Sequence, residues 1–228
     1  SERGGWSWVD CPPEGSDLVR LHYLIRQTKT INALEIGLGE STNVILHALA
    51  LNEEQYQSEV DGYLRRVDPF TLHSVETSEF WLNQVKKKIQ EKYINKLHIT
   101  HSGCYHGTFN DRVCTYFEIF PNISPDFIYL DGPDQFNVGL SVDGLSTRHP
   151  ERMPMSGDLL RIEHFLVPGC VILIDGRTAN ARFLKANFQC NWQYRHFANE
   201  DIHIFIKDEN PLGVYNAREL KFKNLITN

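Results

Sequence analysis

The chain has 228 residues, of which 41% are hydrophobic and 23% charged, and its formal net charge at pH 7 is −6. This composition predicts a globular protein with a core of its own and excludes a disordered or collagen-like chain. No apolar run approaches the length of about 18 residues that a membrane span needs, and the acidic balance argues against nucleic acid as the main partner.

The cysteine pattern bears on the compartment. There are five cysteines, an odd number without a C-x-x-C pair: Cys11, Cys104, Cys114, Cys170 and Cys190. This usage favours free thiols in a reducing compartment, and no leader-like segment opens the chain, so we expect a cytoplasmic protein. No linker interrupts residues 1–228, so we expect a single domain with an irregular segment at 1–16, and a homo-oligomer remains open.

Hydrophobic spacing predicts the helices. They are expected at residues 17–27, 41–51, 78–93, 157–166 and 178–188. In the third of these helices the apolar residues expected to face the core are Phe80, Trp81, Val85 and Ile89. The polar segment 52–68 is predicted to be an inserted helix or a long connection on the surface.

Short apolar runs predict the strands. They are expected at residues 32–36, 71–76, 97–100, 127–131, 170–175, 192–197 and 201–207. Strands alternate with helices up to residue 188, which predicts an α/β fold: a parallel sheet with helices on both faces. The last two strands follow each other closely and predict an antiparallel hairpin at one edge. Residues 221–228 give no prediction.

Polar residues and glycines follow the predicted strands. In an open parallel sheet, ligands bind outside the carboxyl ends of the strands, near the point where strand order reverses. The residues at these ends include Glu35, Glu76, Ser102, Asp131 and Asp175. We therefore expect the functional site at this edge of the sheet.

The first strand runs into a glycine turn that permits three interpretations. A dinucleotide turn needs a third glycine, but Gly37 and Gly39 are followed by Thr42. A phosphate loop of the Walker type needs a G-K-[ST] ending, which is absent. The third interpretation is a site for a cation, because the carboxylate of Glu35 precedes the turn. The sulfonium of S-adenosylmethionine fits this interpretation, and a plain structural turn remains the alternative.

The second strand ends at Glu76. A carboxylate at this place in the sheet can accept hydrogen bonds from the hydroxyls of a ribose. The alternative is a solvated glutamate at a strand end.

Three motifs occur in order and carry a resemblance. They are residues 34–41 (LEIGLGES), 126–132 (DFIYLDG) and 166–175 (LVPGCVILID). Together they resemble class I S-adenosylmethionine-dependent methyltransferases over residues 17–207, and within that class the small-molecule O-methyltransferases of the macrocin and catechol kinds. The resemblance implies a Rossmann-like sheet, S-adenosylmethionine as cofactor, and O-methylation of a sugar or another natural-product hydroxyl.

The resemblance also implies roles for particular residues. The donor site would comprise Glu35, Gly37, Gly39, Ser41, Glu76, Ser102 and Asp131. The candidates for catalysis are Asp131, Asp134 and His106, with His149 as a further base. Asp131 and Asp175 match positions that hold Mg²⁺ in these families. The sequence departs from the family patterns, however, because Asp134 stands where a histidine is usual and Gly176 where an asparagine is usual.

The acceptor is expected to be a small molecule or a glycan, bound under residues 132–154. Arg177 would pair with an anionic acceptor if there is one. Trp6 and Trp8 would cover the donor or contact a partner. Two other functions stay open: a non-catalytic methyltransferase-like partner module and an NAD-dependent oxidoreductase.

Overall fold

The computed structural model describes residues 17–225, so the predictions for 1–16, including Trp6 and Trp8, lie outside the described residues. The helices are α1 (Asp17–Gln27), α2 (Glu40–Tyr63), α3 (Glu79–Lys88), α4 (Asp158–Ile162), α5 (Thr178–Asn187) and α6 (Val214–Phe222), with 3₁₀ turns η2 (Glu91–Lys96), η3 (Gln135–Asn137) and η4 (Glu163–Phe165). The strands are β1 (Asn32–Ile36), β2 (Thr71–Glu76), β3 (Leu97–His101), β4 (Cys104–Phe109), β5 (Arg112–Phe117), β6 (Phe127–Leu130), β7 (Val138–Gly139), β8 (Val171–Asp175), β9 (Trp192–Phe197) and β10 (Ile202–Lys207).

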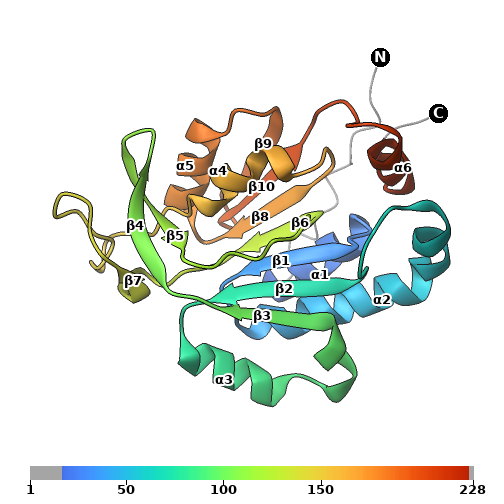
Figure 1. The fold of residues 1–228 in the computed structure, drawn as a ribbon, viewed down its shortest axis with the longest axis horizontal. Helices are drawn as coiled ribbons and strands as arrows, with labels where there is room; N and C mark the ends of the chain where they lie inside the picture. Colours follow the sequence, from blue (N-terminus) through green and yellow to red (C-terminus); the bar gives the residue numbers. More distant parts are fainter. Residues whose placement is uncertain (1–16, 226–228) are drawn as a thin grey trace.

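The main sheet has seven strands in the order β3-β2-β1-β6-β8-β10-β9 (Figure 1). The first five are parallel, while β10 runs antiparallel to both β8 and β9. This confirms the predicted Rossmann-like sheet with an antiparallel hairpin at one edge. Strand order reverses between β1 and β6, which makes the gap beyond their carboxyl ends the expected ligand site.

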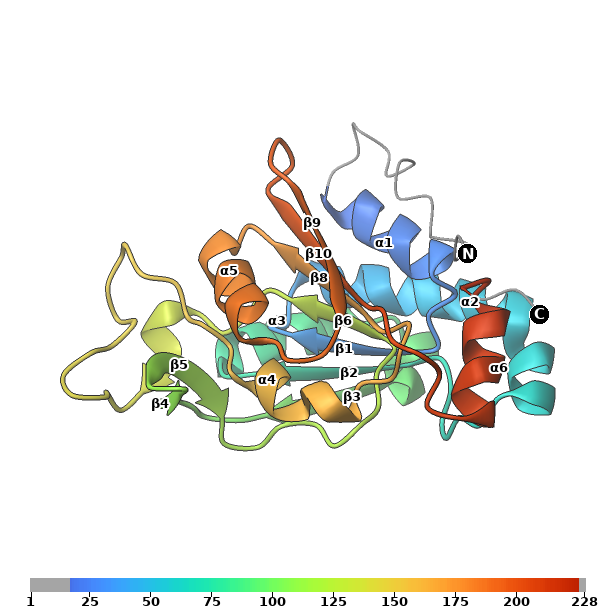
Figure 2. The ribbon, with the colours of Figure 1, turned by 90° about the horizontal axis from the view of Figure 1, so that it is seen from above.

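Helices cover both faces of the sheet, as the alternation predicts. On one face, apolar residues of α1 and α2 pack with Ala33, Tyr129 and Leu173. On the other face, apolar residues of α4 and α5 pack with Ile36 and Ile172. Figure 2 shows α1 and α2 on one side of the strands and α4 on the other. Successive side chains of a strand point to opposite faces of the sheet. Since helices cover both faces, the side chains of β1, β6 and β8 are buried on either side.

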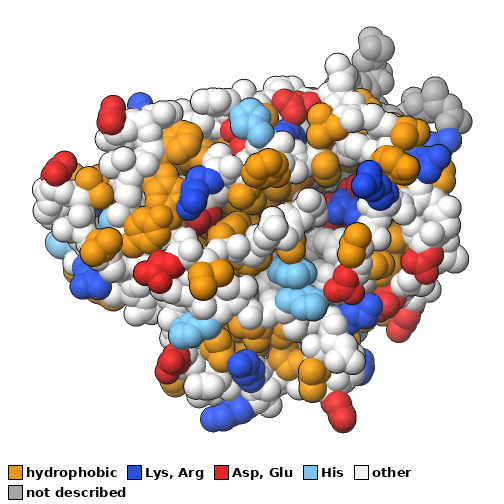
Figure 3. All heavy atoms as spheres, in the orientation of Figure 1, with side chains coloured by type: hydrophobic (Ala, Val, Ile, Leu, Met, Phe, Trp, Pro, Cys, Tyr) orange, Lys and Arg blue, Asp and Glu red, His pale blue; other side chains and the backbone are white. Residues whose placement is uncertain are grey.

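A second, smaller sheet is formed mainly by the segment between β3 and β6. Strands β4, β5 and β7 form it in the order β5-β4-β7, and it extends beyond the carboxyl ends of the main strands together with residues 132–154 (Figures 1 and 2). The sequence analysis assigns no element to residues 102–125. Apolar side chains gather over β4, β5 and α4 on the face seen in Figure 3, where a cavity of about 570 Å³ lies between Phe117, Phe120 and Phe165.

Two helices differ from their predictions. Helix α2 continues to Tyr63, so most of the polar segment 52–68 is helical. Helix α3 ends at Lys88, and the prediction that Phe80 and Trp81 face inward is wrong, because they are 62% and 46% exposed. Leu82 and Val85 are buried instead. The side chain of Ser78 caps the helix by accepting from the Trp81 amide.

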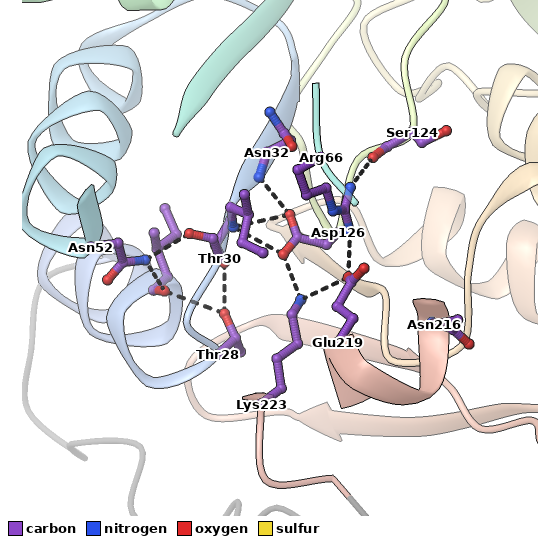
Figure 4. A network of polar contacts seen from close by, with 12 residues as sticks. Thr28, Thr30, Asn32, Asn52, Arg66, Ser124, Asp126, Asn216, Glu219 and Lys223 are labelled. Atoms are coloured by element: carbon purple, nitrogen blue, oxygen red, sulfur yellow. Dashed lines mark hydrogen bonds and ion pairs between the residues drawn. The ribbon is translucent and has the colours of Figure 1, made fainter. Parts of the chain in front are cut away.

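A buried polar network closes the amino end of the sheet (Figure 4). The Asp126 carboxylate accepts hydrogen bonds from the amides of Ile31 and Asn32 and pairs with Lys223, which directly follows α6. Burial alone would raise the pKa of Asp126, but Lys223 and Arg66 outweigh it and hold the pKa below its usual range. The network fastens α6 to the starts of β1 and β6.

None of the helices within residues 17–225 is both long enough and apolar enough to cross a membrane.

Candidate active site

The turns after β1 and β6 touch each other at two glycines. Gly37 has φ +100°, and a Cβ placed on it would lie 2.8 Å from the backbone nitrogen of Gly132. A Cβ on Gly132 would lie 2.7 Å from the Cα of Gly37. Both positions therefore require glycine for contact between the two turns, which is a different reason from the predicted ligand contact at Gly37.

Gly39, in contrast, has open space beside its backbone. Its φ of −169° is open to any residue, and the nearest atom to a Cβ placed there is the Ser41 hydroxyl at 3.8 Å. The space beside Gly39 is therefore where a ligand can approach the backbone at the start of α2.

Glu35 lies inside the protein beneath this turn. Its carboxylate accepts hydrogen bonds from the hydroxyls of Ser41 at 2.6 Å, Ser74 at 2.7 Å and Thr42 at 2.9 Å. The side chain is fully buried. Ser41 thus donates its hydroxyl to Glu35. Thr42, which stands in place of a third glycine, also donates to this carboxylate. Any effect of Glu35 on a ligand acts through its charge and through the position of these hydroxyls.

Glu76 holds the glycine turn from the next strand. Its Oε2 accepts from the Leu38 amide at 2.9 Å, and its Oε1 accepts from the amides of Thr77 at 2.7 Å and Ser78 at 2.6 Å. A carboxylate offers about four acceptor positions. Oε2 therefore keeps one position, which suits a single ribose hydroxyl rather than the predicted pair.

Two aspartates and a tyrosine lie at the ends of β6 and β8. The Asp131 carboxylate faces Arg177, with Nε 3.3 Å from Oδ1, and about half of its side chain is exposed. Asp175 accepts a hydrogen bond from the Tyr129 hydroxyl at 3.4 Å. Tyr129 packs with Ala33 and Leu173 on one face of the sheet, and Glu35 and Asp175 each lie two residues beyond one of these, on β1 and β8. The Glu35, Tyr129 and Asp175 side chains therefore lie on the α1–α2 face of the sheet.

Their proximity changes how these groups ionise. Burial raises the pKa of Glu35 to about 7, although its hydroxyl partners work against this. Burial also raises the pKa of Asp175 to about 6, with help from the negative charges of Asp17 and Asp131. Partial burial raises the pKa of Asp131 against the effect of Arg177. The Tyr129 hydroxyl pKa is raised by burial and by all three carboxylates. The site is thus poor in positive charge.

The magnesium prediction does not fit this donor set. Mg²⁺ requires a compact set of oxygen ligands, whereas the Asp131 carboxylate already faces a guanidinium and Asp175 is bonded to Tyr129. Among residues 17–225, the clusters that bring three ligand atoms together lie elsewhere. Arg177 also donates to the carbonyls of Asp131 and Pro133, and these hydrogen bonds stabilise the turn after β6.

The other predicted residues have structural partners. His106 Nδ1 faces the carbonyls of Gly139 and Leu140, and its Nε2 accepts from the Thr147 amide at 2.9 Å. Neither ring nitrogen is free, so we do not retain His106 as the base. Ser102 donates to the Gly103 carbonyl and accepts from the Ile119 amide.

The two remaining candidates for the base are exposed. Asp134 caps η3 by accepting from the Phe136 amide, and His149 accepts from the Glu151 amide. Both keep acceptor capacity toward solvent.

Sequence reasoning missed Tyr129 and Ser74. Both stand in predicted strands, at two residues before Asp131 and two before Glu76. The alternation of side chains along a strand places each on the same face as that acidic neighbour, so the signal was present in the spacing.

Comparisons with known proteins found no matching family model and no matching curated protein. Among solved structures, the chain is similar to the O-methyltransferase TomG of Streptomyces achromogenes, in complex with S-adenosylmethionine, at 13% identity over 88% of this chain and 83% of that chain (TM-score 0.46). It is similar to an O-methyltransferase of Bacillus cereus in complex with S-adenosylhomocysteine (SAH), at 14% identity over 87% of this chain and 86% of that chain (TM-score 0.45). A precorrin-6y C5,15-methyltransferase of Geobacter metallireducens shares 10% identity over 88% and 92% (TM-score 0.47).

Proposed function

We propose that the chain is an S-adenosylmethionine-dependent methyltransferase that methylates a hydroxyl of a sugar or another natural product. The observation that carries this proposal is that three carboxylates with raised pKa values, Glu35, Asp131 and Asp175, lie at the carboxyl ends of the neighbouring strands β1, β6 and β8. The turn after β1 also has open space at Gly39. Carboxylates that lack sufficient counter-charge attract a cation, and the donor's sulfonium is one.

The donor would lie along the turn after β1. The space beside Gly39 admits its amino-acid part, and the remaining acceptor position of Glu76 suits a ribose hydroxyl. Glu35 would act from beneath the turn, through its charge and through Ser41 and Thr42.

When bound, the donor would supply a methyl group on a positively charged sulfur. The acceptor oxygen would displace this sulfur in line, and the sulfur would leave as a neutral thioether with the electron pair of the carbon–sulfur bond. The proton of the acceptor hydroxyl passes to a carboxylate. Asp131 is the best placed, because it is half exposed at the carboxyl end of β6, and its raised pKa suits a general base. Arg177 positions this turn, and residues 132–154 would cover the acceptor.

The NAD-dependent alternative has less support. A pyrophosphate needs the amino end of a helix free of negative charge, but α2 begins with Glu40 and covers buried Glu35. Thr42 also fills the place of the third glycine and is fully buried.

Calorimetry with S-adenosylhomocysteine tests donor binding. Gly39→Leu fills the open space, and we expect binding at least about tenfold weaker with an unchanged melting temperature. Gly62→Leu is the matched control, because Gly62 also has open space but lies in the second half of α2, far along the chain from the turn. No binding by the wild type at millimolar ligand would overturn the proposal.

Turnover separates an enzyme from a non-catalytic module. With labelled S-adenosylmethionine and a mixture of small hydroxylated acceptors, we expect methyl transfer by the wild type and its loss in Asp131→Asn, while S-adenosylhomocysteine binding persists. Donor binding without transfer to any acceptor would favour the partner module.

A further inference from the structure

Histidines form stacked pairs across neighbouring strands at two places in the main sheet. His73 on β2 stacks on His98 of β3 with ring centroids 4.4 Å apart. His196 on β9 stacks on His203 of β10 with centroids 4.0 Å apart and ring planes at 14°. Both pairs are in register, so their side chains lie on the same face. What distinguishes the two pairs is whether the carboxylate beside them completes a compact set of ligand atoms.

The first pair also has a carboxylate beside it, because Asp68 Oδ2 lies 3.1 Å from Nε2 of His98. Within residues 17–225, however, only the second pair forms with its carboxylate a group of three whose ligand atoms all lie close together. Asp201 Oδ1 lies 4.0 Å from Nε2 of His203, and one donor atom from each of His196, Asp201 and His203 lies within 4.8 Å of the others. Ligand atoms around a tetrahedral zinc ion are about 3.4 Å apart, since zinc binds nitrogen and oxygen at about 2.0–2.2 Å. His196 and Asp201 are exposed and can move by this small difference.

The surroundings of the pair support ligation. The Tyr194 hydroxyl lies 2.9 Å from Nδ1 of His203, on the ring nitrogen that a metal at Nε2 would leave free. Such a contact to the second nitrogen commonly orients a ligating histidine. The Thr178 hydroxyl now lies between the ligand atoms, 2.8 Å from Asp201 Oδ1 and 2.9 Å from His203 Nε2. An ion bound by Asp201 and His203 would take the place of the Thr178 hydroxyl at these two atoms.

A second cluster of three ligand-type residues is less suitable. Glu163, His164 and Cys190 also come together. The Glu163 carboxylate, however, is buried and accepts hydrogen bonds from three donors, the amides of Gln189 and Cys190 and the Trp192 indole. A metal there would have to break these hydrogen bonds.

We propose that His196, Asp201 and His203 bind a divalent transition-metal ion of the zinc type, with water completing the coordination. The set is two imidazoles and one carboxylate, which zinc, nickel and copper accept and magnesium does not favour. The ion would link three residues of the β9–β10 hairpin, whose tip stands out from the body of the molecule in Figure 2. Arg182 of α5 places positive charge near His203, which limits the affinity.

The site would also bear on the candidate active site. The Asp201 carbonyl accepts from the Gly176 amide at 3.0 Å, directly between Asp175 and Arg177. Because β10 runs antiparallel to β8, the hairpin tip and the end of β8 share one edge of the sheet. The metal site does not depend on methyl transfer, and its test does not use activity.

The test is titration of chelator-treated full chain with Co²⁺, followed by visible absorption, and with Zn²⁺, followed by thermal unfolding. We expect one tight site per chain and a melting temperature several degrees higher at saturating Zn²⁺. His196→Gln and Asp201→Asn each should weaken binding about tenfold or more. Both residues are exposed, and asparagine tolerates the φ of 50° at position 201, so the folds of these variants should be intact.

His98→Gln is the matched control, because it removes one histidine from the other stacked pair. We expect it to bind Co²⁺ and Zn²⁺ as the wild type does. The proposal is overturned if His196→Gln and Asp201→Asn bind as tightly as the wild type, or if His98→Gln loses as much affinity as they do.

Discussion

At the scale of single residues, Glu35 shows how a buried acid can serve a site without touching it. Three hydroxyls surround its carboxylate and link β1, β2 and the first turn of α2. With a pKa of about 7, the group is divided between its neutral and charged forms near neutral pH. Its charge, and therefore the field under the glycine turn, responds to what binds above it.

Replacement of Glu35 should change how stability depends on pH. The pKa of Glu35 is about 7 in the fold against 4.5 for the free side chain. A group with a raised pKa stabilises the fold fully below the unfolded pKa, and this contribution is lost as the pH rises through the folded pKa. The free energy of unfolding of the wild type, relative to Glu35→Gln, should therefore fall by on the order of 3 kcal/mol from pH 4 to pH 8.

Urea denaturation at a series of pH values measures this difference. Glu54→Gln, on an exposed part of α2, is the control for the loss of one carboxylate. A difference between wild type and Glu35→Gln that does not vary with pH would contradict the prediction.

The sequence located the acidic residues of the site but not their contacts. Glu35, Asp131 and Asp175 could be placed at one edge because they follow or end predicted strands, and strand ends in a parallel sheet share an edge. That Glu35 points into the core depends on the hydroxyls of Ser74 and Thr42, which come from other elements. Likewise, His106 is predicted as a base from its type alone, whereas Thr147 and residues 139–140 occupy its ring nitrogens.

At the scale of elements, prediction succeeded where one periodic pattern spans one element. The strands at 32–36, 71–76 and 192–197 and the helix at 17–27 have the predicted bounds. The β4–β5 hairpin was missed because its strands carry mixed side chains. Its signal is the two-residue turn Asn110–Asp111, where both residues have positive φ, 49° and 60°. Asparagine and aspartate tolerate this conformation, which favours a tight hairpin.

The attachment of α6 rests on a buried ion pair, and this predicts a large effect from one substitution. Asp126→Ala leaves the buried Lys223 with Glu219, 3.7 Å away, as its remaining carboxylate, and side-chain exposure at the Asp126–Lys223 pair is 0% and 1%. Breaking a buried pair on one side costs about 3–5 kcal/mol. We expect that loss in the free energy of unfolding from urea denaturation.

An exposed pair provides the comparison. Lys88 and Glu40 also form an ion pair, but both side chains are more than half exposed. Lys88→Met should cost less than about 1 kcal/mol. Similar costs for Asp126→Ala and Lys88→Met would show that the Asp126 network does not fasten α6.

At the scale of the whole molecule, charge should distinguish donor from product. The chain is acidic, with a formal net charge of −6, and three carboxylates with raised pKa values converge at the proposed site. S-adenosylmethionine and S-adenosylhomocysteine differ there by one positive charge on sulfur. A cation favours the ionised carboxylates, while a neutral thioether does not.

The ratio of the two affinities should therefore depend on pH. As the pH rises from 5.5 to 8, the carboxylates lose protons, and binding of S-adenosylmethionine relative to S-adenosylhomocysteine should strengthen by about tenfold, the equivalent of one pKa unit. Calorimetry with both ligands at several pH values measures the ratio, and groups common to the two ligands cancel. A ratio that does not change with pH would show that the carboxylates do not recognise the donor's positive charge, even if both ligands bind.

The contact between Gly37 and Gly132 limits which amino-acid substitutions the two positions can accept. Each glycine is required by the backbone of the other, and neither can become smaller to accommodate a change in its partner. A substitution at one therefore has no compensating substitution at the other. Two positions 95 residues apart in the printed sequence are thus constrained together without being able to covary.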